Sequence, residues 1–498
     1  MSKKTRALVP SALTRRDALS GAASLSALGL VGCGGEGEGI DSAQLGATGQ
    51  KPKVAVLGGG AGGLATAYFL DGVCDVTVFE SRGKVGGHCD SQTVQYGGQA
   101  VTVDLGAQFF SPATHPIYAT LLEELGLFNP DSPNTDETLE APGSVCIFPM
   151  TGGYPFGSGW PRFCSTQPLL TPFRAIDFAI YSQFARQAIL GNMSWETRLD
   201  DWINGLPVSR DFKDNLLFPW ISALIGTTRA NAVRASARSI LQTFALSFPA
   251  NPLDGASTFN SKIGLGGNLE RMLARATGAQ TEVNVAVQSL AYANGLWTVQ
   301  TAGGARGPFD AVVINAPPHA SKGFLGGLGW ASDLVGLLSR YEYFDSKIVV
   351  HTDAPYIHRD KTFRTVYNAG IKSGGVECEG SVWLGGIHDK LPNGKTIDIY
   401  KSWTQNRTSQ PSNVLLQRTF KHPHITPDAI RAARSLAPLQ GRNGLYFAGQ
   451  HTTGFDLQEA AVWSAIQVAN SLAPSSPTLA ALNARLTARG RTGISYAL

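Results

Sequence analysis

The sequence predicts an α/β fold in which a Rossmann-like domain, built from separated segments, carries an inserted α+β domain. An apolar strand at residues 53–57 leads into a glycine-rich turn and a helix, and a second strand follows at 75–79. A buried-strand pattern at 309–317 lies far along the chain and ends in proline. We therefore expect one sheet to collect strands from distant parts of the sequence.

The glycine-rich turn has the spacing that binds an adenine dinucleotide. Gly58 permits a tight turn, Gly60 lets a pyrophosphate approach the backbone, and Gly63 lets the helix pack close to the strand. The start of the helix presents unpaired N–H groups to the phosphates. Glu80 ends the second strand, where its carboxylate can accept hydrogen bonds from an adenosine ribose. This order of elements favours a dinucleotide site over a glycine loop that binds nothing.

The composition is that of an ordinary soluble protein. The 498 residues are 43% hydrophobic and 16% charged, which allows two domains and an extensive core. The formal charge is +4, and residues 1–32 account for all of it because they hold five basic residues and one acid. The remainder sums to zero, so the charge does not predict a nucleic-acid partner.

The N-terminus has the features of a targeting segment. Residues 14–19 form a twin-arginine signature, and the uncharged stretch that follows is too short to span a bilayer permanently. It ends at Cys33 in a pattern that resembles a lipobox, whose cysteine becomes lipidated. We predict a twin-arginine lipoprotein-type signal at 1–32, a flexible tether at 33–50, and a periplasmic or cell-surface protein anchored through Cys33. An organellar targeting peptide and a disordered tail are the alternatives.

The other cysteines do not indicate a metal site. Five remain when Cys33 is set aside, an odd number without metal-ligand spacing, so we predict no metal. Cys89 lies close to the glycine-rich segments, where a small buried hydrophobic residue is expected rather than a redox partner.

Local patterns place the remaining elements. We expect the Rossmann-like domain to comprise residues 51–118, 262–318 and 435–475, and a substrate or cap domain to comprise 119–261 and 319–434, before a tail helix within 476–498. Further helices are expected at 264–274, 459–472 and 479–489, and cap helices around Ile176, Ile180 and Phe184 and at 212–224. Strands are expected at 283–290, 297–301, 347–351 and 380–384, with a hairpin turn at Asn294 and Gly295.

Four segments together resemble the amine-oxidase-like FAD superfamily, namely residues 80–88, 103–108, 444–451 and 459–465. The Gly-Gly-His opening at 86–88 is nearest to a less characterised branch, because typical amine oxidases carry arginine in place of this histidine. The branch is also indicated by His-Thr-Asp at 351–353 and Lys-His-Pro at 421–423. The resemblance implies FAD rather than NAD, held by Gly58, Gly60, Ala61, Gly62, Gly63, Glu80, Ser81, Arg82, Gly86, Gly87, His88, Gly106, Ala107, Gln108, Val287, Gly449, Gln450, Glu459, Ala460, Ala461 and Val462.

The resemblance also implies catalytic residues. Many amine oxidases carry a lysine whose ammonium holds a water at flavin N5, and Lys347 lies at the corresponding place in its strand. An edge-strand lysine that extends to solvent is the alternative. Phe455 lies where these enzymes often place an aromatic wall facing the substrate amine, although their pair of cage tyrosines is not evident.

We therefore expect an FAD-dependent oxidoreductase of amine-oxidase type. It would transfer a hydride from a C–N or activated C–C bond of a small organic substrate to flavin N5, with oxygen or another acceptor taking the electrons. A desaturase or isomerase of acyl or isoprenoid chains is the first alternative. A FAD-binding lipoprotein without turnover is the second, because kinship of fold does not decide function.

Overall fold

A five-stranded parallel sheet forms the first layer of the fold, as the sequence predicts. Its order is β19-β13-β1-β2-β9, with every neighbouring pair parallel. The strands are β1 (Lys53–Leu57), β2 (Asp75–Phe79), β9 (Gln280–Glu282), β13 (Ala311–Ile314) and β19 (Leu445–Phe447). They come from the three separated segments expected for the Rossmann-like domain. Val54 to Leu57 are all buried, as befits a central strand covered on both faces.

The computed structural model describes residues 50–132, 137–149, 160–251, 254–353, 357–371, 378–388, 390–405 and 410–498. The predicted targeting segment, and all but the last residue of the tether, lie outside these ranges. The described residues belong to one unit by their internal contacts.

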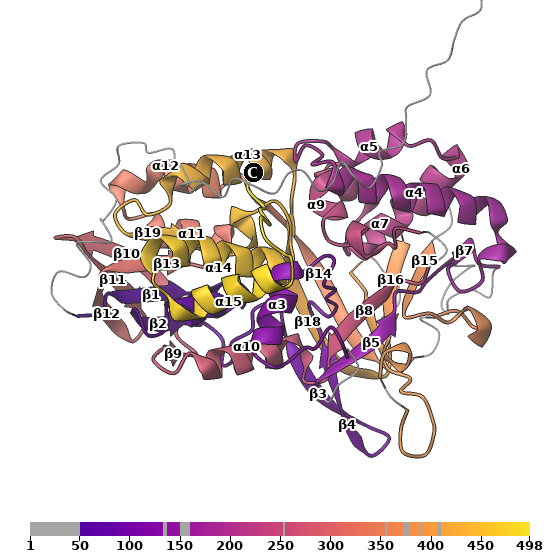
Figure 1. Ribbon diagram of the computed structural model, residues 1–498, viewed down its shortest axis with the longest axis horizontal. Coiled ribbons are helices and arrows are strands. Elements are labelled where there is room, and N and C mark those ends of the chain that lie inside the picture. The colour runs from indigo at the N-terminus through magenta and orange to yellow at the C-terminus, as the bar shows by residue number, and fades with distance from the viewer. Residues whose placement is uncertain are drawn as a thin grey trace, which may run out of the picture. The chain divides into compact units, whose positions relative to one another are not determined.

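Helices cover the parallel sheet on both sides (Figure 1). Helix α2 (Ala61–Leu70) is buried from Gly62 to its end, because it is apolar all round and packs against α10 (Gly264–Arg275) and α14 (Gln458–Leu472). Outside these lie α3 (Pro116–Glu124) and the tail helix α15 (Pro477–Ala488). The antiparallel sheet β10 (Val287–Ala293), β11 (Leu296–Thr301) and β12 (Gly304–Phe309) contributes to a second apolar cluster.

The hairpin between β10 and β11 turns as predicted. Asn294 and Gly295 both have positive φ, 51° and 80°, which is the conformation of a type I′ turn. The expected strand at 283–290 begins later than predicted, at Val287, because the preceding residues run from β9 into a loop.

A mixed seven-stranded sheet forms the core of the inserted part. Its order is β18-β14-β17-β16-β15-β6-β7, and only β15 and β6 run parallel. The strands are β6 (Val145–Pro149), β7 (Phe163–Cys164), β14 (Glu342–His351), β15 (Tyr367–Ile371), β16 (Cys378–Trp383), β17 (Tyr400–Trp403) and β18 (Val414–His424). Two antiparallel pairs complete the strands, β3 (Ser91–Tyr96) with β4 (Gln99–Asp104) and β5 (Thr138–Pro142) with β8 (Ser257–Ser261).

Helices gather beside one end of this sheet in Figure 1. They are α4 (Pro172–Leu190), α5 (Leu199–Gly205), α6 (Arg210–Phe212), α7 (Phe218–Leu224), α8 (Arg229–Ala232) and α9 (Ala237–Leu241), and α7 packs on β15 and β16. The cap helix expected around Ile176 forms, but its apolar stripe does not face inward. Ile176 and Phe184 are 58% and 47% exposed, whereas Tyr181 and Ala185 on the other face are fully buried.

One expected boundary differs from the packing. Helices α11 (Pro318–Leu325) and α12 (Ser332–Leu338), expected in the cap domain, pack on the cluster that contains β1 and β13. The tail helix is joined to α3 by ion pairs, in which Arg485 pairs with Glu124 at 2.6 Å and Arg489 with Glu123 at 2.7 Å. Within the described ranges, none of the helices combines the length and the hydropathy needed to cross a bilayer.

Candidate functional site

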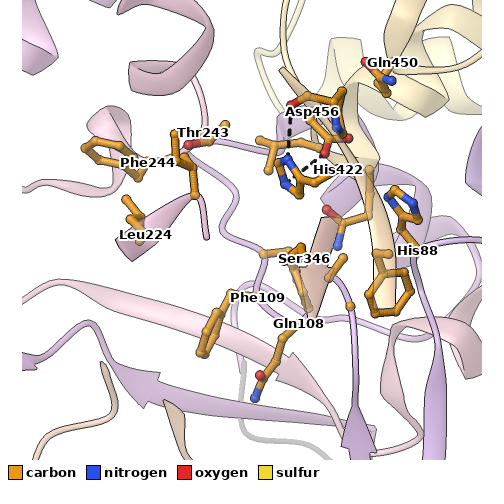
Figure 2. Close-up of a pocket in the computed structure, with 18 of the residues that line it drawn as sticks. His88, Gln108, Phe109, Leu224, Thr243, Phe244, Ser346, His422, Gln450 and Asp456 are labelled. Carbon is orange, nitrogen blue, oxygen red and sulfur yellow. Dashed lines mark hydrogen bonds and ion pairs between the residues drawn. The ribbon is translucent and has the colours of Figure 1, made fainter. Parts of the chain in front are cut away.

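One cavity of about 1660 Å³ joins the two parts of the fold. Its glycine arm is lined by Gly58, Gly60, Gly62, Glu80, Arg82 and Val287. Its apolar arm is lined by Phe163, Phe178, Trp220, Leu224, Phe244 and Phe248. Between them lies a junction lined by His88, Gln108, Lys401, His422 and Asp456. Figure 2 shows Leu224 and Phe244 on one side of this space and His88 and Gln450 on the other.

The glycine arm is shaped by crossing backbone segments that leave no room for side chains. Gly58 has a φ of +110°, and Asn315 Nδ2 donates to its carbonyl at 3.0 Å. Gly86 donates from its N–H to the carbonyl of Gly59 at 2.7 Å. A Cβ on Gly62 would lie 2.5 Å from Asn315 Oδ1. Because α2 begins directly after Gly60 without a side-chain cap, its first N–H groups remain available to a ligand.

Glu80 is held rigidly at the far end of this arm. One carboxylate oxygen accepts from the N–H of Gly59 and the other from the N–H of Arg82, both at 2.9 Å. The side chain is only 6% exposed and lines the cavity. Oε1 also accepts from the Ser81 hydroxyl at 3.3 Å, whereas Oε2 keeps a second lone pair to which a ribose hydroxyl could donate.

Lys401 is a buried cation at the junction. Its ammonium donates to the Gly106 carbonyl at 2.5 Å and to Gln108 Oε1 at 3.2 Å, and the residue is 2% exposed. Burial lowers the pKa of Lys401 to about 8, an effect that the nearby Asp104 opposes. Burial likewise raises the pKa of Asp104 to about 6, which its hydrogen bond from Ser91 opposes.

Imidazoles and a carboxylate lie on the other side of the junction. His422 Nε2 lies 3.5 Å from Asp456 Oδ2, and both residues line the cavity (Figure 2). His88 packs edge-on against the ring of Phe420, with 5.3 Å between the ring centroids. Burial is the largest influence on His88 and lowers its pKa, whereas Asp456 acts in the opposite direction. The junction thus offers groups that can hold or move a proton.

The apolar arm carries no charge on its helical wall. Among the described residues, those that α4, α7 and α9 contribute to the cavity are apolar or carry a neutral hydroxyl group. Phe163 stacks on Phe178 with ring centroids 4.4 Å apart, and Trp220 packs at 5.6 Å from Phe178. An apolar or aromatic molecule would gain from burial here, at roughly 25 cal/mol per Å² of apolar surface.

Most of the residues predicted to bind the cofactor line this cavity. They are Gly58, Gly60, Ala61, Gly62, Glu80, Ser81, Arg82, Gly86, Gly87, His88, Gly106, Ala107, Gln108, Val287, Gly449, Gln450 and Ala461. Gly63 lies behind the cavity wall instead, where a Cβ would approach the Gly58 carbonyl oxygen to 2.0 Å. This agrees with its expected role in close packing of helix and strand. Ala460 and Val462 are fully buried in the core.

Lys347 is not among the lining residues. Its neighbours Ser346 and Ile348 face the cavity, so the alternation of β14 turns Lys347 to the opposite face. There its ammonium donates to Gln410 at 3.0 Å. The family resemblance pointed to Lys347 on β14, whereas the buried lysine that lines the cavity is Lys401 on the adjacent β17. The sequence signal for this buried lysine is its position between Tyr400 and Ser402 in a strand-like pattern.

Phe455 and Glu459 also belong to the core rather than to the cavity. Phe455 is fully buried, with its ring near those of Trp195 and Tyr496. Glu459 is fully buried too, and it accepts hydrogen bonds from the N–H groups of Ile117 and Tyr118 and from the Tyr496 hydroxyl. It therefore caps α3 and is not among the residues that line the cavity. The motif histidine His351 is likewise buried and bonds to Ser402 at 2.8 Å.

The burial of Glu459 predicts a pH dependence of stability. Burial raises its pKa from an ordinary 4.5 to about 7, so the folded chain binds this proton more tightly than the unfolded chain. The free energy of unfolding should fall as the pH rises from about 4.5 to about 7. We expect Glu459→Gln to lose this slope in denaturant titrations across that range. An unchanged slope in the variant would assign the effect to another group.

The lining residues fit an adenine dinucleotide. The glycine arm combines uncapped N–H groups at α2, a Cβ-free passage at Gly60 and a carboxylate at Glu80. At the junction His451 Nε2 is buried without a hydrogen-bond partner in the described part of the chain. Burial lowers the pKa of His451 to about 4, so it is a neutral imidazole available to a polar ligand. We conclude that the donor set suits phosphates at one end and a polar ring at the other.

Comparison with solved structures finds the same fold in several proteins. The CLA-producing fatty acid isomerase from P. acnes has a TM-score of 0.57 at 13% identity, covering 84% of this chain and 98% of that one. Putrescine oxidase bound to putrescine has a TM-score of 0.55 at 16% identity, covering 84% and 98%. An oxidoreductase from Methanosarcina mazei has a TM-score of 0.54 at 13% identity, covering 84% and 99%. At these identities the likeness shows the fold alone.

Sequence comparison shows the family. Tryptophan 2-monooxygenase of Allorhizobium ampelinum is 41% identical over 80 residues, which are 16% of this chain and only 11% of that enzyme. The model of the flavin-containing amine oxidoreductases matches residues 61–342, more than half of the chain. The resemblance predicted from the four sequence segments is thereby confirmed. The chain belongs to the flavin-containing amine oxidoreductase family.

Proposed function

We propose that the protein binds FAD along the glycine arm and oxidises an organic molecule whose apolar part occupies the apolar arm. The observation that carries this proposal is the single cavity that joins both arms through a charged junction. Glu80 would hold the adenosine ribose, the start of α2 would hold the pyrophosphate, and the junction would hold the flavin ring. When bound, the flavin ring accepts a hydride from a C–N or activated C–C bond and passes the electrons to oxygen or another acceptor.

The residues of the junction supply charge and proton transfer. The ammonium of Lys401 favours negative charge that develops nearby, because its field acts in a buried environment of low dielectric. This residue takes the role that the family resemblance first suggested for Lys347. The His422–Asp456 pair can accept a proton that leaves the substrate, since the imidazole and its partner carboxylate both line the cavity. The aromatic wall excludes water from the substrate.

A second candidate is desaturation or isomerisation of an acyl or isoprenoid chain. It is favoured by the uncharged helical wall of the apolar arm, which offers burial to a long hydrocarbon but no carboxylate to an ammonium group. The two candidates share the cofactor and differ in the substrate. An amine substrate would instead have to pair with a carboxylate outside the helical wall, such as Asp456 at the junction, where His422 already lies, or Asp254, which also lines the cavity.

The proposal is tested first by the colour of the purified protein. We expect a flavin absorbance spectrum, release of FAD on denaturation, and anaerobic bleaching by a substrate of the correct class. A panel of amines and a panel of unsaturated acyl and isoprenoid compounds separate the two candidates, with peroxide release and double-bond position as readouts. A folded, colourless protein that does not take up FAD would contradict the proposal. A yellow protein that no compound bleaches would favour a binding lipoprotein.

We also propose export by the twin-arginine route and anchoring through a lipidated Cys33. Replacement of Cys33 by serine should leave flavin content and turnover unchanged and should move the protein from the membrane fraction to the soluble fraction. Cell fractionation with immunoblotting is the measurement. As a control, a Lys3→Gln variant should remain in the membrane fraction, because it retains the arginine pair and the cysteine. Membrane association of the serine variant equal to wild type would count against lipidation.

A further inference from the structure

Two buried cysteines face each other across adjacent strands of the inserted sheet. Cys146 on β6 is the register partner of Cys164 on β7 in an antiparallel pair. They are 0% and 1% exposed and share a small cluster with Phe148 and Phe363. Nothing in the proposed flavin chemistry uses either sulfur.

The register of this pair is suitable for a cross-link. The N–H of Ser165 donates to the Val145 carbonyl at 2.9 Å, a bond that flanks Cys146 and Cys164 instead of joining them. Such a position is a non-hydrogen-bonded pair, in which the Cα atoms lie roughly 4.5 Å apart and the side chains approach most closely. That separation falls inside the range of about 4.4–6.8 Å found for disulfides.

The two sulfurs are chemically different. The Cys146 thiol donates a hydrogen bond to the Cys164 sulfur, which also lies 3.2 Å from Thr166 Oγ1. This hydrogen bond from Cys146 is the largest cause that lowers the pKa of Cys164, to about 6, and it raises the pKa of Cys146. By contrast, burial raises the pKa of the solitary Cys74 to about 11. Cys164 also has the hydroxyl of the cavity-lining Thr166 beside its sulfur, so we assign Cys164 as the nucleophile of the pair and Cys146 as its partner.

We propose that Cys146 and Cys164 form a peroxide-responsive thiol pair that closes into a disulfide beside the substrate cavity. The neighbouring residues Val145, Phe163, Ser165 and Thr166 line that cavity. Val145 and Phe163 face the cavity, so Cys146 and Cys164 point to the opposite face of their strands, but Thr166 lines the cavity and its Oγ1 lies 3.2 Å from Cys164 Sγ. A small oxidant that enters the apolar arm therefore comes within one side chain of the Cys164 sulfur. Hydrogen peroxide is such an oxidant, and a flavin oxidase releases it when oxygen takes up the electrons. To this extent the inference rests on the proposed function.

The reaction is balanced without a further reagent. The Cys164 thiolate attacks one oxygen of hydrogen peroxide, so that an S–O bond forms as the O–O bond breaks, and the departing hydroxide takes up a proton to give water. The Cys146 thiol then attacks the sulfenic sulfur. An S–S bond forms as the S–O bond breaks, and the thiol proton leaves with the hydroxide as a second water. Two thiols are oxidised by two electrons, and one peroxide is reduced to two waters.

The test applies added peroxide to the full-length protein, so its outcome does not depend on flavin turnover. After alkylation under denaturing conditions and digestion, mass spectrometry should find a peptide linked through Cys146 and Cys164, which dithiothreitol separates. Cys74, Cys89 and Cys378 should remain alkylated as thiols. If Cys146 and Cys164 are still fully alkylated after peroxide treatment, the proposal is wrong, and this readout needs no variant.

Two matched serine variants assign the roles. In Cys146→Ser the sulfenic acid on Cys164 has no partner, so dimedone should label Cys164 at least about tenfold faster than Cys74, following its larger thiolate fraction. In Cys164→Ser the remaining Cys146 should stay unlabelled. Equal labelling of the two variants would overturn the assignment. A substrate screen that finds no oxidase activity would remove the source of peroxide, whereas the linked peptide would still form.

Discussion

Replacing Gly60 by valine should give a folded protein that has lost its flavin. A Cβ at this position would meet Asn315 Nδ2 at 3.2 Å and the Gly87 Cα at 3.7 Å, so the fold can accept it if the Asn315 side chain shifts by a few tenths of an ångström. The φ of −82° is open to any residue. The branched methyl groups would instead occupy the passage where a pyrophosphate must approach the backbone. We expect the ratio of flavin to protein to fall by about tenfold or more, because close approach to the phosphates is lost.

Two other glycines show whether the effect is specific. In Gly63→Ala the new Cβ would lie 2.0 Å from the Gly58 carbonyl oxygen, so this variant should lower the midpoint of unfolding. In Gly323→Ala, in α11, the Cβ meets nothing within 4 Å, so colour and stability should persist. Absorbance spectra give the flavin content, and circular dichroism during thermal unfolding gives the stability. A yellow, flavin-replete Gly60→Val protein would refute the placement of the pyrophosphate.

The glycine arm could be predicted because its chemistry is local. The turn at Gly58, the passage at Gly60 and the acid at Glu80 are set by spacing along a single strand, helix and strand. The structure brings the distant Gly449 to the same place because β19 lies beside β13 in the sheet. The sequence could indicate this only through resemblance, since no local pattern specifies which strands become neighbours.

The direction in which a side chain points could not be predicted from its distance in sequence to a cavity-lining residue. Glu459 lies two residues before Ala461, which lines the cavity, yet it points toward the start of α3. Its partners Ile117 and Tyr118 are more than three hundred residues away in the chain, so no window around Glu459 contains them. Phe455 immediately precedes the cavity residue Asp456 and still packs into the core. In a helix successive side chains point in directions about 100° apart, so two residues are enough to turn Glu459 away from the cavity that Ala461 lines.

The same argument separates the two lysines, and their replacement by methionine should have opposite outcomes. Lys401→Met removes a buried cation from the junction, and we expect the rate of substrate-dependent flavin turnover to fall by about a hundredfold, the usual cost of losing one electrostatic group at a reacting centre. Lys347→Met removes a cation that bonds to Gln410 outside the cavity, so its rate should stay within about twofold of wild type. Stopped-flow measurement of flavin reduction and reoxidation locates the affected step.

The pH dependence distinguishes lost chemistry from lost structure. The pKa of Lys401 is about 8 in the fold and about 10.4 in an unfolded chain, so the unfolded chain binds more protons between these values. The free energy of unfolding of wild type should therefore rise with pH across that interval, whereas turnover that needs the charged ammonium should decline above pH 8. Lys401→Met should lose both dependences while it retains flavin, and Lys347→Met should keep both. The opposite result would be that Lys347→Met loses the decline in turnover above pH 8 and Lys401→Met keeps it. The charge at the reacting centre would then belong to Lys347, and the Lys347 side chain would have to face the cavity.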